Sequence, residues 1–124
     1  MTYQLTVEQR PTYVHAKAVG ERTAENALRF LKDAYVACVN AGQSSLLLEM
    51  QLEGPRLSES SIFEVLSDRI ADGLKLRKIA YVDSARDVSQ AYFAETVAMN
   101  RGVNVRFFPS VAQAAAWLTA ADAS

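Results

Sequence analysis

A nearly continuous apolar run from Leu46 to Leu52 constrains the fold of this chain more than any other feature of the sequence. A strand that shows one face to water alternates apolar and polar residues, whereas a strand covered on both faces is apolar almost throughout. The run has the length of a strand, and Gly54 and Pro55 interrupt regular structure just after it. The sequence therefore predicts a strand in the centre of a sheet.

A cluster of serines follows this strand and is typical of a helix start. Ser61 and Glu64 have the spacing of a capping box, in which the serine oxygen accepts a bond from a backbone amide and the glutamate reaches back. Apolar residues then recur every three or four positions, at Ile62, Phe63, Leu66, Ile70 and Leu74. We expect an amphipathic helix that begins at Ser61 and ends near Gly73.

The N-terminal third predicts two strands and a helix. Tyr3, Leu5 and Val7 alternate with polar residues, as in a strand with one wet face at a sheet edge. A short connection leads to a second strand, 13–19, and favours an antiparallel pair. A helix should follow from a cap at Thr23 to about residue 41, with Gly42 just beyond it. Its predicted apolar face contains Leu28, Leu31, Tyr35 and Cys38.

The C-terminal third predicts two further strands and two further helices. The strands span 78–82 and 103–108. Ser84 should cap the helix between them, which continues to about residue 101, and Ser110 with Gln113 should cap the last helix. The order is therefore β-β-α-β-α-β-α-β-α, which predicts an α/β fold with a single mixed, mostly parallel five-stranded sheet and four helices. We expect residues 1–124 to form one domain.

Composition excludes several classes of protein. A formal net charge of -1 with 22% charged residues gives no basic footprint for nucleic acid, so we expect no nucleic-acid partner. No apolar run approaches the roughly 20 residues of a membrane span, so we expect no transmembrane segment. The single cysteine, Cys38, cannot form an intramolecular disulfide, and a cytoplasmic location is expected.

Two stretches of the sequence are characteristic of a family: LLLEM before a serine-bearing helix start, and the ending NVRFFPSVAQAAAWL. They resemble the STAS domain, the fold of bacterial anti-sigma factor antagonists, and above all its SpoIIAA-like branch, which is related to the lipid-binding domain of SEC14. In antagonists a partner kinase phosphorylates the first serine of an Asp-Ser-Ser-Gly motif at the second helix. The matching residues here are 59–62, with glutamate for aspartate and no glycine. The resemblance implies Ser60 as the phosphoacceptor.

The predicted topology places a candidate binding site at one edge of the sheet. Ligands of open α/β sheets bind outside the carboxyl ends of the parallel strands, where loops and helix N-termini converge. The candidate binding residues at this edge are Arg22, Ser58, Glu59, Ser60, Ser61, Asp83, Ser84 and Arg86. For the three serines near position 60, simple helix capping is the alternative to a regulatory or ligand-binding role.

Neither His15 nor Cys38 is expected to be catalytic. His15 is the only histidine and lies within a strand, where a surface or partly buried packing role is expected. Cys38 lies on the predicted apolar face of a helix, where cysteine behaves as a small hydrophobe. No zinc, nucleotide or dinucleotide motif is present, so no metal and no cofactor are expected.

These observations predict a non-enzymatic, cytoplasmic STAS-like module with a regulatory or binding role. It would engage a protein partner or a small apolar or anionic ligand at the C-terminal edge of the sheet. Two alternatives stay open. One is a phosphorylation-switched protein like the anti-sigma factor antagonists, and the other is a small enzyme with a carboxylate and arginine site at the same edge, to which Glu53 would also contribute. A homodimer also stays open.

Overall fold

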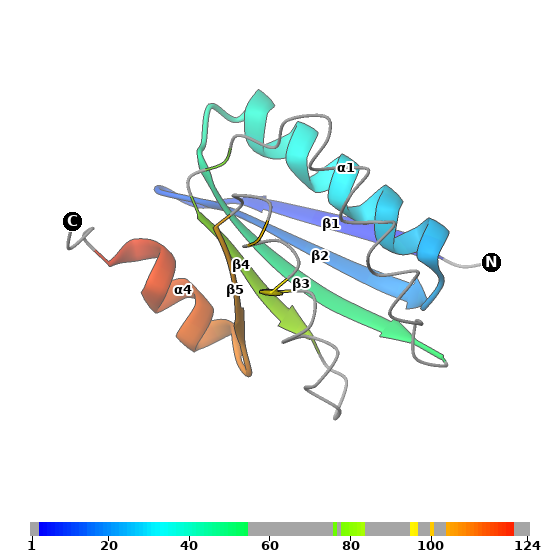
Figure 1. Ribbon diagram of the computed structural model, residues 1–124. Helices are drawn as coiled ribbons and strands as arrows, with labels where there is room; N and C mark the ends of the chain where they lie inside the picture. Colours follow the sequence, from blue (N-terminus) through cyan, green and yellow to red (C-terminus); the bar gives the residue numbers. More distant parts are fainter. Residues whose placement is uncertain are drawn as a thin grey trace.

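The computed structural model describes residues 3–54, 76, 78–83, 95–96, 100 and 104–120. Its elements are β1 (Tyr3–Gln9), β2 (Val14–Glu21), α1 (Ala24–Asn40), β3 (Ser45–Glu53), β4 (Lys78–Asp83), β5 (Val105–Phe108) and α4 (Val111–Thr119) (Figure 1). The strands form one sheet in the order β1-β2-β3-β4-β5. β1 is antiparallel to β2, and the other neighbouring pairs are parallel. The predicted α/β class, mixed sheet, antiparallel edge strand and central strand are confirmed.

Two of the four predicted helices, α1 and α4, lie within the described residues. The helix predicted from Ser61 to Gly73 falls outside them. Most of the helix predicted after Ser84 also falls outside them, although Glu95, Thr96 and Asn100 are described and helical.

The helix caps explain where α1 and α4 begin and where α1 ends. Thr23 is extended, and its hydroxyl accepts a bond of 3.0 Å from the Asn26 amide. The Ser110 hydroxyl accepts one of 3.2 Å from the Gln113 amide in the same way. Gly42 follows α1 with a φ of +71°, a left-handed conformation that glycine adopts without strain. The predicted caps of these two helices are confirmed.

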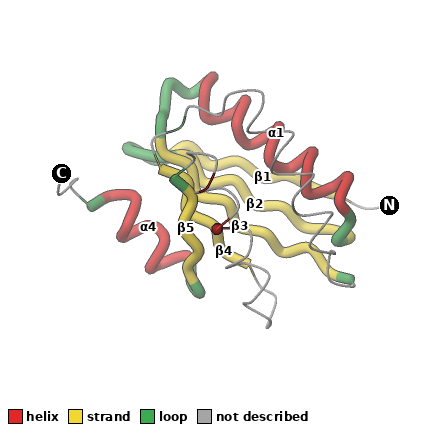
Figure 2. The backbone as a smooth tube through the Cα atoms, in the orientation of Figure 1, coloured by secondary structure: helices red, strands yellow, loops and turns green. Residues whose placement is uncertain are grey.

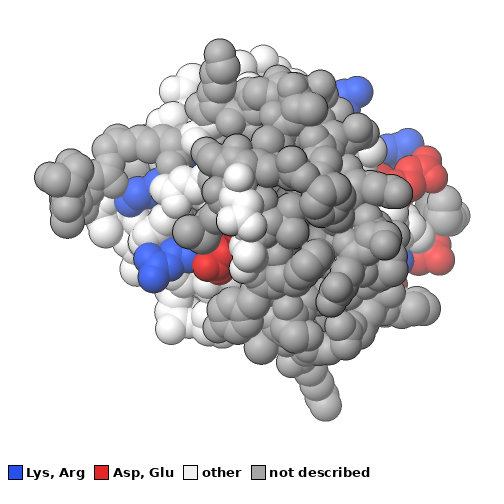
Figure 3. All heavy atoms as spheres, in the orientation of Figure 1, with Lys and Arg blue, Asp and Glu red and all other residues white. Residues whose placement is uncertain are grey.

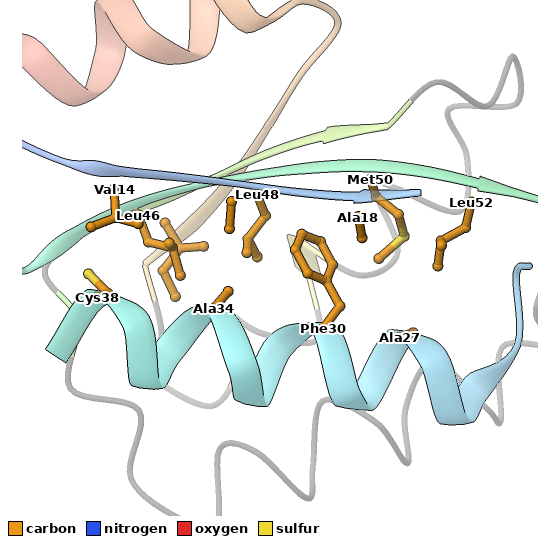
Figure 4. Close-up of a cluster of buried hydrophobic side chains, with 12 residues drawn as sticks. Val14, Ala18, Ala27, Phe30, Ala34, Cys38, Leu46, Leu48, Met50 and Leu52 are labelled. Carbon is orange, nitrogen blue, oxygen red and sulfur yellow. The ribbon is translucent and has the colours of Figure 1, made fainter. Parts of the chain in front are cut away.

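The larger core cluster lies between α1 and one face of the sheet. Alternate residues of β2 and β3 point toward the helix because successive strand side chains point to opposite faces. Figure 4 shows the Phe30 ring directed from α1 toward this face of the sheet. The described members of this cluster are Val14, Ala16, Ala18, Ala27, Phe30, Ala34, Cys38, Leu46, Leu48, Met50, Leu52 and Ile79. Their apolar burial fixes α1 across β1, β2 and β3.

The buried face of α1 corrects the sequence prediction. The structure buries Ala27, Phe30 and Ala34 together with Cys38, whereas Leu28, Leu31 and Tyr35 are only half-buried. Helix α1 is apolar at so many positions that its periodicity fits more than one face. The face that is buried carries Phe30 at its centre with small alanines on either side, which let the helix approach the sheet, and Leu28, Leu31 and Tyr35 lie at its flank.

Helix α4 covers the opposite face of the sheet, over β3, β4 and β5 (Figure 2). The buried members of this second cluster are Leu47, Ala80, Val82, Ala114 and Leu118. Lys78 is buried beside the end of α4, where its Nζ donates to the Trp117 carbonyl oxygen at 3.0 Å and lies 5.1 Å from the Trp117 ring centroid. A cation at a helix C-terminus is stabilised by the exposed carbonyls and by the helix dipole, so Lys78 anchors α4 to the sheet.

Candidate functional site

The C-terminal ends of β2 and β3 lie side by side and are held by one arginine. Glu21 is opposite Glu53 in the parallel register. The Arg22 amide donates to the Glu53 carbonyl oxygen at 2.7 Å, and Arg22 Nη1 donates to the Gly54 carbonyl oxygen at 3.3 Å. Both the backbone and the side chain of Arg22 therefore hold the chain as it leaves β3.

Gly54 takes a backbone conformation that glycine alone adopts readily. Its φ is +131°, a region that residues with a side chain rarely adopt. A Cβ atom added there would lie 3.8 Å from the Arg22 amide nitrogen, so space alone would allow a larger residue. Glycine is required at this position by its backbone angle, which turns the chain next to Arg22.

The N-terminus of α1 belongs to the same edge. The Thr23 cap begins the helix directly after Arg22. One turn on, Asn26 is 3% exposed, and its Nδ2 donates to the Glu21 carbonyl oxygen at 2.8 Å. The bond ties the first turn of α1 to the end of β2. The helix start and the two strand ends therefore form one hydrogen-bonded unit, and we name residues 21–23 with 53–54 the strand-end unit.

The structure describes two of the eight predicted binding residues. Arg22 lies in the strand-end unit, and Asp83 is the last residue of β4, where it pairs in register with Met50 of β3. The other six, Ser58, Glu59, Ser60, Ser61, Ser84 and Arg86, lie outside the described residues. The structure brings Arg22 together with Glu53, and a binding role for all eight residues stays a prediction.

A polar cluster that the sequence analysis missed lies on the sheet face that α4 partly covers. His15 Nε2 donates to Glu49 Oε1 at 2.8 Å, and Gln51 Nε2 donates to Glu49 Oε2 at 2.6 Å. The His15 and Glu49 side chains are 15% and 14% exposed. His15 and Glu49 are 34 residues apart in the chain. The available signal was Glu49 itself, the one charged residue inside the apolar run.

The geometry of this cluster explains what it can do chemically. A carboxylate that binds one imidazole nitrogen orients the ring, as in catalytic pairs, and the second nitrogen then faces a nucleophile or substrate. Within the described residues, His15 has no hydroxyl or thiol as a hydrogen-bond partner. The cluster therefore satisfies three polar groups on a partly covered sheet face, which agrees with the packing role expected for His15.

Among the described residues, charged side chains, metal-binding groups and membrane-spanning helices point to no further candidate site. Basic and acidic side chains lie near one another on the face shown in Figure 3. The described part of the chain has no group of three or more histidine, cysteine or acidic residues arranged for a metal ion. Neither of the fully described helices, α1 and α4, has the length and apolar character needed to cross a membrane.

Comparison with solved structures gives one informative neighbour. It is an uncharacterised protein of the DUF3478 family from Shewanella loihica, with a SpoIIAA-like fold. The match has a TM-score of 0.56 and 18% sequence identity, and it covers 94% of this chain and 93% of the other. No protein-family model and no curated protein match the chain. The chain therefore has a SpoIIAA-like fold, as the resemblance of its sequence implies.

Proposed function

We propose that this protein is a non-enzymatic regulatory or binding module that engages its partner at the C-terminal edge of the sheet. The observation that carries the proposal is the strand-end unit, in which Arg22 holds Gly54 beside the N-terminus of α1. Gly54 is the residue from which the chain leads into the serine cluster 58–61. A binding segment is positioned more precisely when a rigid scaffold fixes the residue from which it starts.

The chemistry of this edge fits a protein partner or a small anionic ligand. Unpaired amides and the dipole at a helix N-terminus favour negative charge, and an arginine can add hydrogen bonds to a carboxylate or phosphate. A cytoplasmic location fits the one cysteine, Cys38, which is a free and buried thiol. We assign no catalytic residue at this edge.

Photocrosslinking in cells tests the location of the site with a matched control. A photoreactive amino acid replaces Glu53 in one variant and Ser44 in another, and these two exposed residues lie at opposite ends of β3. We expect a discrete adduct from the Glu53 variant and none from the Ser44 variant. Adducts from Ser44 alone would contradict the proposal, because they would place the partner at the opposite edge of the sheet.

A phosphorylation switch is the second candidate function, and the SpoIIAA-like fold is the observation that favours it. The resemblance assigns the switch to Ser60. We expect Ser60→Glu to abolish the adduct formed through Glu53, because it adds negative charge at the phosphoacceptor position that the resemblance implies. Ser60→Ala should keep the adduct. Equal adducts from both variants would remove the switch and leave the binding site in place.

A further inference from the structure

The two edge strands of the sheet, β1 and β5, differ in length and in what their backbone groups contact. At one edge, β1 is seven residues long, and five of them are exposed. At the other edge, β5 has four residues, and the Phe107 amide donates to Glu95 Oε2 at 2.9 Å. A carboxylate therefore occupies an edge position on β5 where another strand would bind. Exposed edge strands are templates for strand pairing unless something blocks them.

The hydrogen bonds of the hairpin show which backbone groups of β1 point outward. The Arg10 amide donates to the Tyr13 carbonyl oxygen at 2.9 Å, and these two residues continue the β1–β2 register. In an antiparallel pair, hydrogen-bonded and non-hydrogen-bonded positions alternate. The even-numbered residues of β1 therefore bond to β2. The residues whose backbone groups point away from the sheet are Tyr3, Leu5, Val7 and Gln9.

We infer that β1 pairs with β1 of a second copy of this chain, antiparallel and centred on Thr6, so that two sheets join into one. A two-fold axis through Thr6 places Leu5 opposite Val7 and Gln4 opposite Glu8 of the other copy. In this register all four outward-facing residues of each strand pair with outward-facing residues of the other. A two-fold axis makes such an interface self-complementary.

The side chains of β1 fit this partner. Glu8 is the only charged residue in the strand, and the axis through Thr6 brings it opposite glutamine, so like charges do not meet. Val7 is 42% exposed and lies on the same face as Leu5, which packs against the core under α1. Pairing Val7 with Leu5 of the second copy would extend this apolar face across the axis.

Sedimentation at increasing protein concentration tests the interface with a matched pair of variants. Val7→Lys places a charge in the apolar part of the proposed interface between the two β1 strands. Val19→Lys changes a valine of equal exposure, 41%, on the interior strand β2. We expect Val7→Lys to raise the dimer dissociation constant about tenfold or more, and Val19→Lys to change it less than about twofold. A wild-type chain that stays monomeric throughout would overturn the proposal and leave the edge to a strand of another protein.

Disulfide trapping tests the register. Thr6 would face Thr6 of the other copy in a non-hydrogen-bonded pair, where the Cα atoms lie about 4.5 Å apart, a distance that a disulfide spans. Under mild oxidation we expect Thr6→Cys to form a covalent dimer, while Gln4→Cys alone does not. Gln4→Cys mixed with Glu8→Cys should form a covalent heterodimer. Cys38 is fully buried, so unmodified chain gives the baseline. Crosslinking of Gln4→Cys to itself, or no crosslinking of Thr6→Cys, would overturn the pairing.

Discussion

The two faces of the sheet are formed by the same strands but carry different side chains. On the α1 face, β3 contributes four buried apolar residues, Leu46, Leu48, Met50 and Leu52. On the other face it contributes Leu47 under α4 and then Glu49 and Gln51, and the Glu49 carboxylate accepts hydrogen bonds from both Gln51 and His15. The apolar run that predicts a strand covered on both faces is therefore apolar on one face along its length and on the other only in its first half.

This difference indicates which face of the sheet contributes more to the stability of the fold. Among the described residues, the α1 face is covered by one long helix with a fully buried aromatic ring. In the same part of the chain, the α4 face is covered by a helix of nine residues and a buried lysine, with polar side chains beside them. We expect substitutions on the α1 face to cost more free energy of unfolding than comparable ones on the α4 face.

The largest expected effect comes from Phe30, which is 0% exposed in the centre of the α1 face. Phe30→Ala should lower the free energy of unfolding by about 3–5 kcal/mol, because it removes a ring and leaves a cavity. Leu118→Ala, at a 5% exposed position on the α4 face, should cost about 2–3 kcal/mol. Urea denaturation measures both. A larger loss for Leu118→Ala would reverse the comparison.

The next effect concerns the lysine that anchors α4. Lys78→Met keeps most of the apolar stem against Trp117 but removes the donor to its carbonyl oxygen, and it should cost about 1–2 kcal/mol. Lys17→Met, at a half-buried position on β2, is the control and should stay within about 0.5 kcal/mol of wild type. Equal effects in urea denaturation would mean that Lys78 does not anchor the helix.

A smaller effect should come from the polar cluster. Glu49→Ala leaves the His15 and Gln51 donors without their acceptor and should cost about 1 kcal/mol. In a double-mutant cycle with His15→Ala, the two losses should fall short of additivity by about 0.5 kcal/mol or more, because the pair is in direct contact. Additive losses would show that the bond does not contribute to stability.

The smallest effect is a pH dependence from Cys38. Burial on the α1 face raises the pKa of its thiol from 9.0 to about 11. The thiol of the folded chain keeps its proton while that of the unfolded chain loses it, so the contribution of Cys38 to stability is full well below pH 9 and is lost as the pH rises through 9 toward 11. Between pH 7.5 and 9.5 we expect a loss of somewhat under 1 kcal/mol, absent in Cys38→Ala.

The measurement should stay below pH 10. Burial and the neighbouring Asp33 carboxylate raise the pKa of Tyr3 to about 12, so Tyr3 adds its own loss of stability above that pH. A thiol reagent should also label Cys38 slowly in the native chain, because the side chain is fully buried. Fast labelling would show that the reagent reaches Cys38 on the α1 face. The same pH dependence in Cys38→Ala would show that another group causes the loss of stability.

The sequence predicted those parts of the fold that depend on neighbouring residues. Thr23 and Ser110 cap their helices through amides three residues on, so local spacing was sufficient. The edge position of β1 followed from its alternation and from the short hairpin. The buried face of α1 was predicted only in part: Cys38 is buried and Leu31 packs against the core, but packing against the sheet centres the face on Phe30 and the alanines rather than on Leu28 and Tyr35.

The sequence was sufficient to predict the location of the candidate site. It was not sufficient to predict the contacts within the site. Strand order alone brings the ends of β2 and β3 together, so Arg22 and Glu53 were expected at one edge. The bond from Arg22 to Gly54 depends on one φ angle, which a sequence does not specify. The pairing of His15 with Glu49 depends on the register of two strands separated by a helix, and a shift of one residue would have turned them to opposite faces.

The bond between Glu95 and Phe107 limits how many copies can join. A sheet with two open edges can grow at both, and each added copy presents a new edge, which leads to filaments without a defined length. Among the described residues, the outward-facing Phe107 amide of β5 is already bonded to the Glu95 carboxylate, so in the proposed dimer β1 is the edge that accepts another strand. Assembly through β1 would then stop at two copies. We therefore expect Glu95 to act as a terminator, whose removal favours an assembly without a defined number of copies.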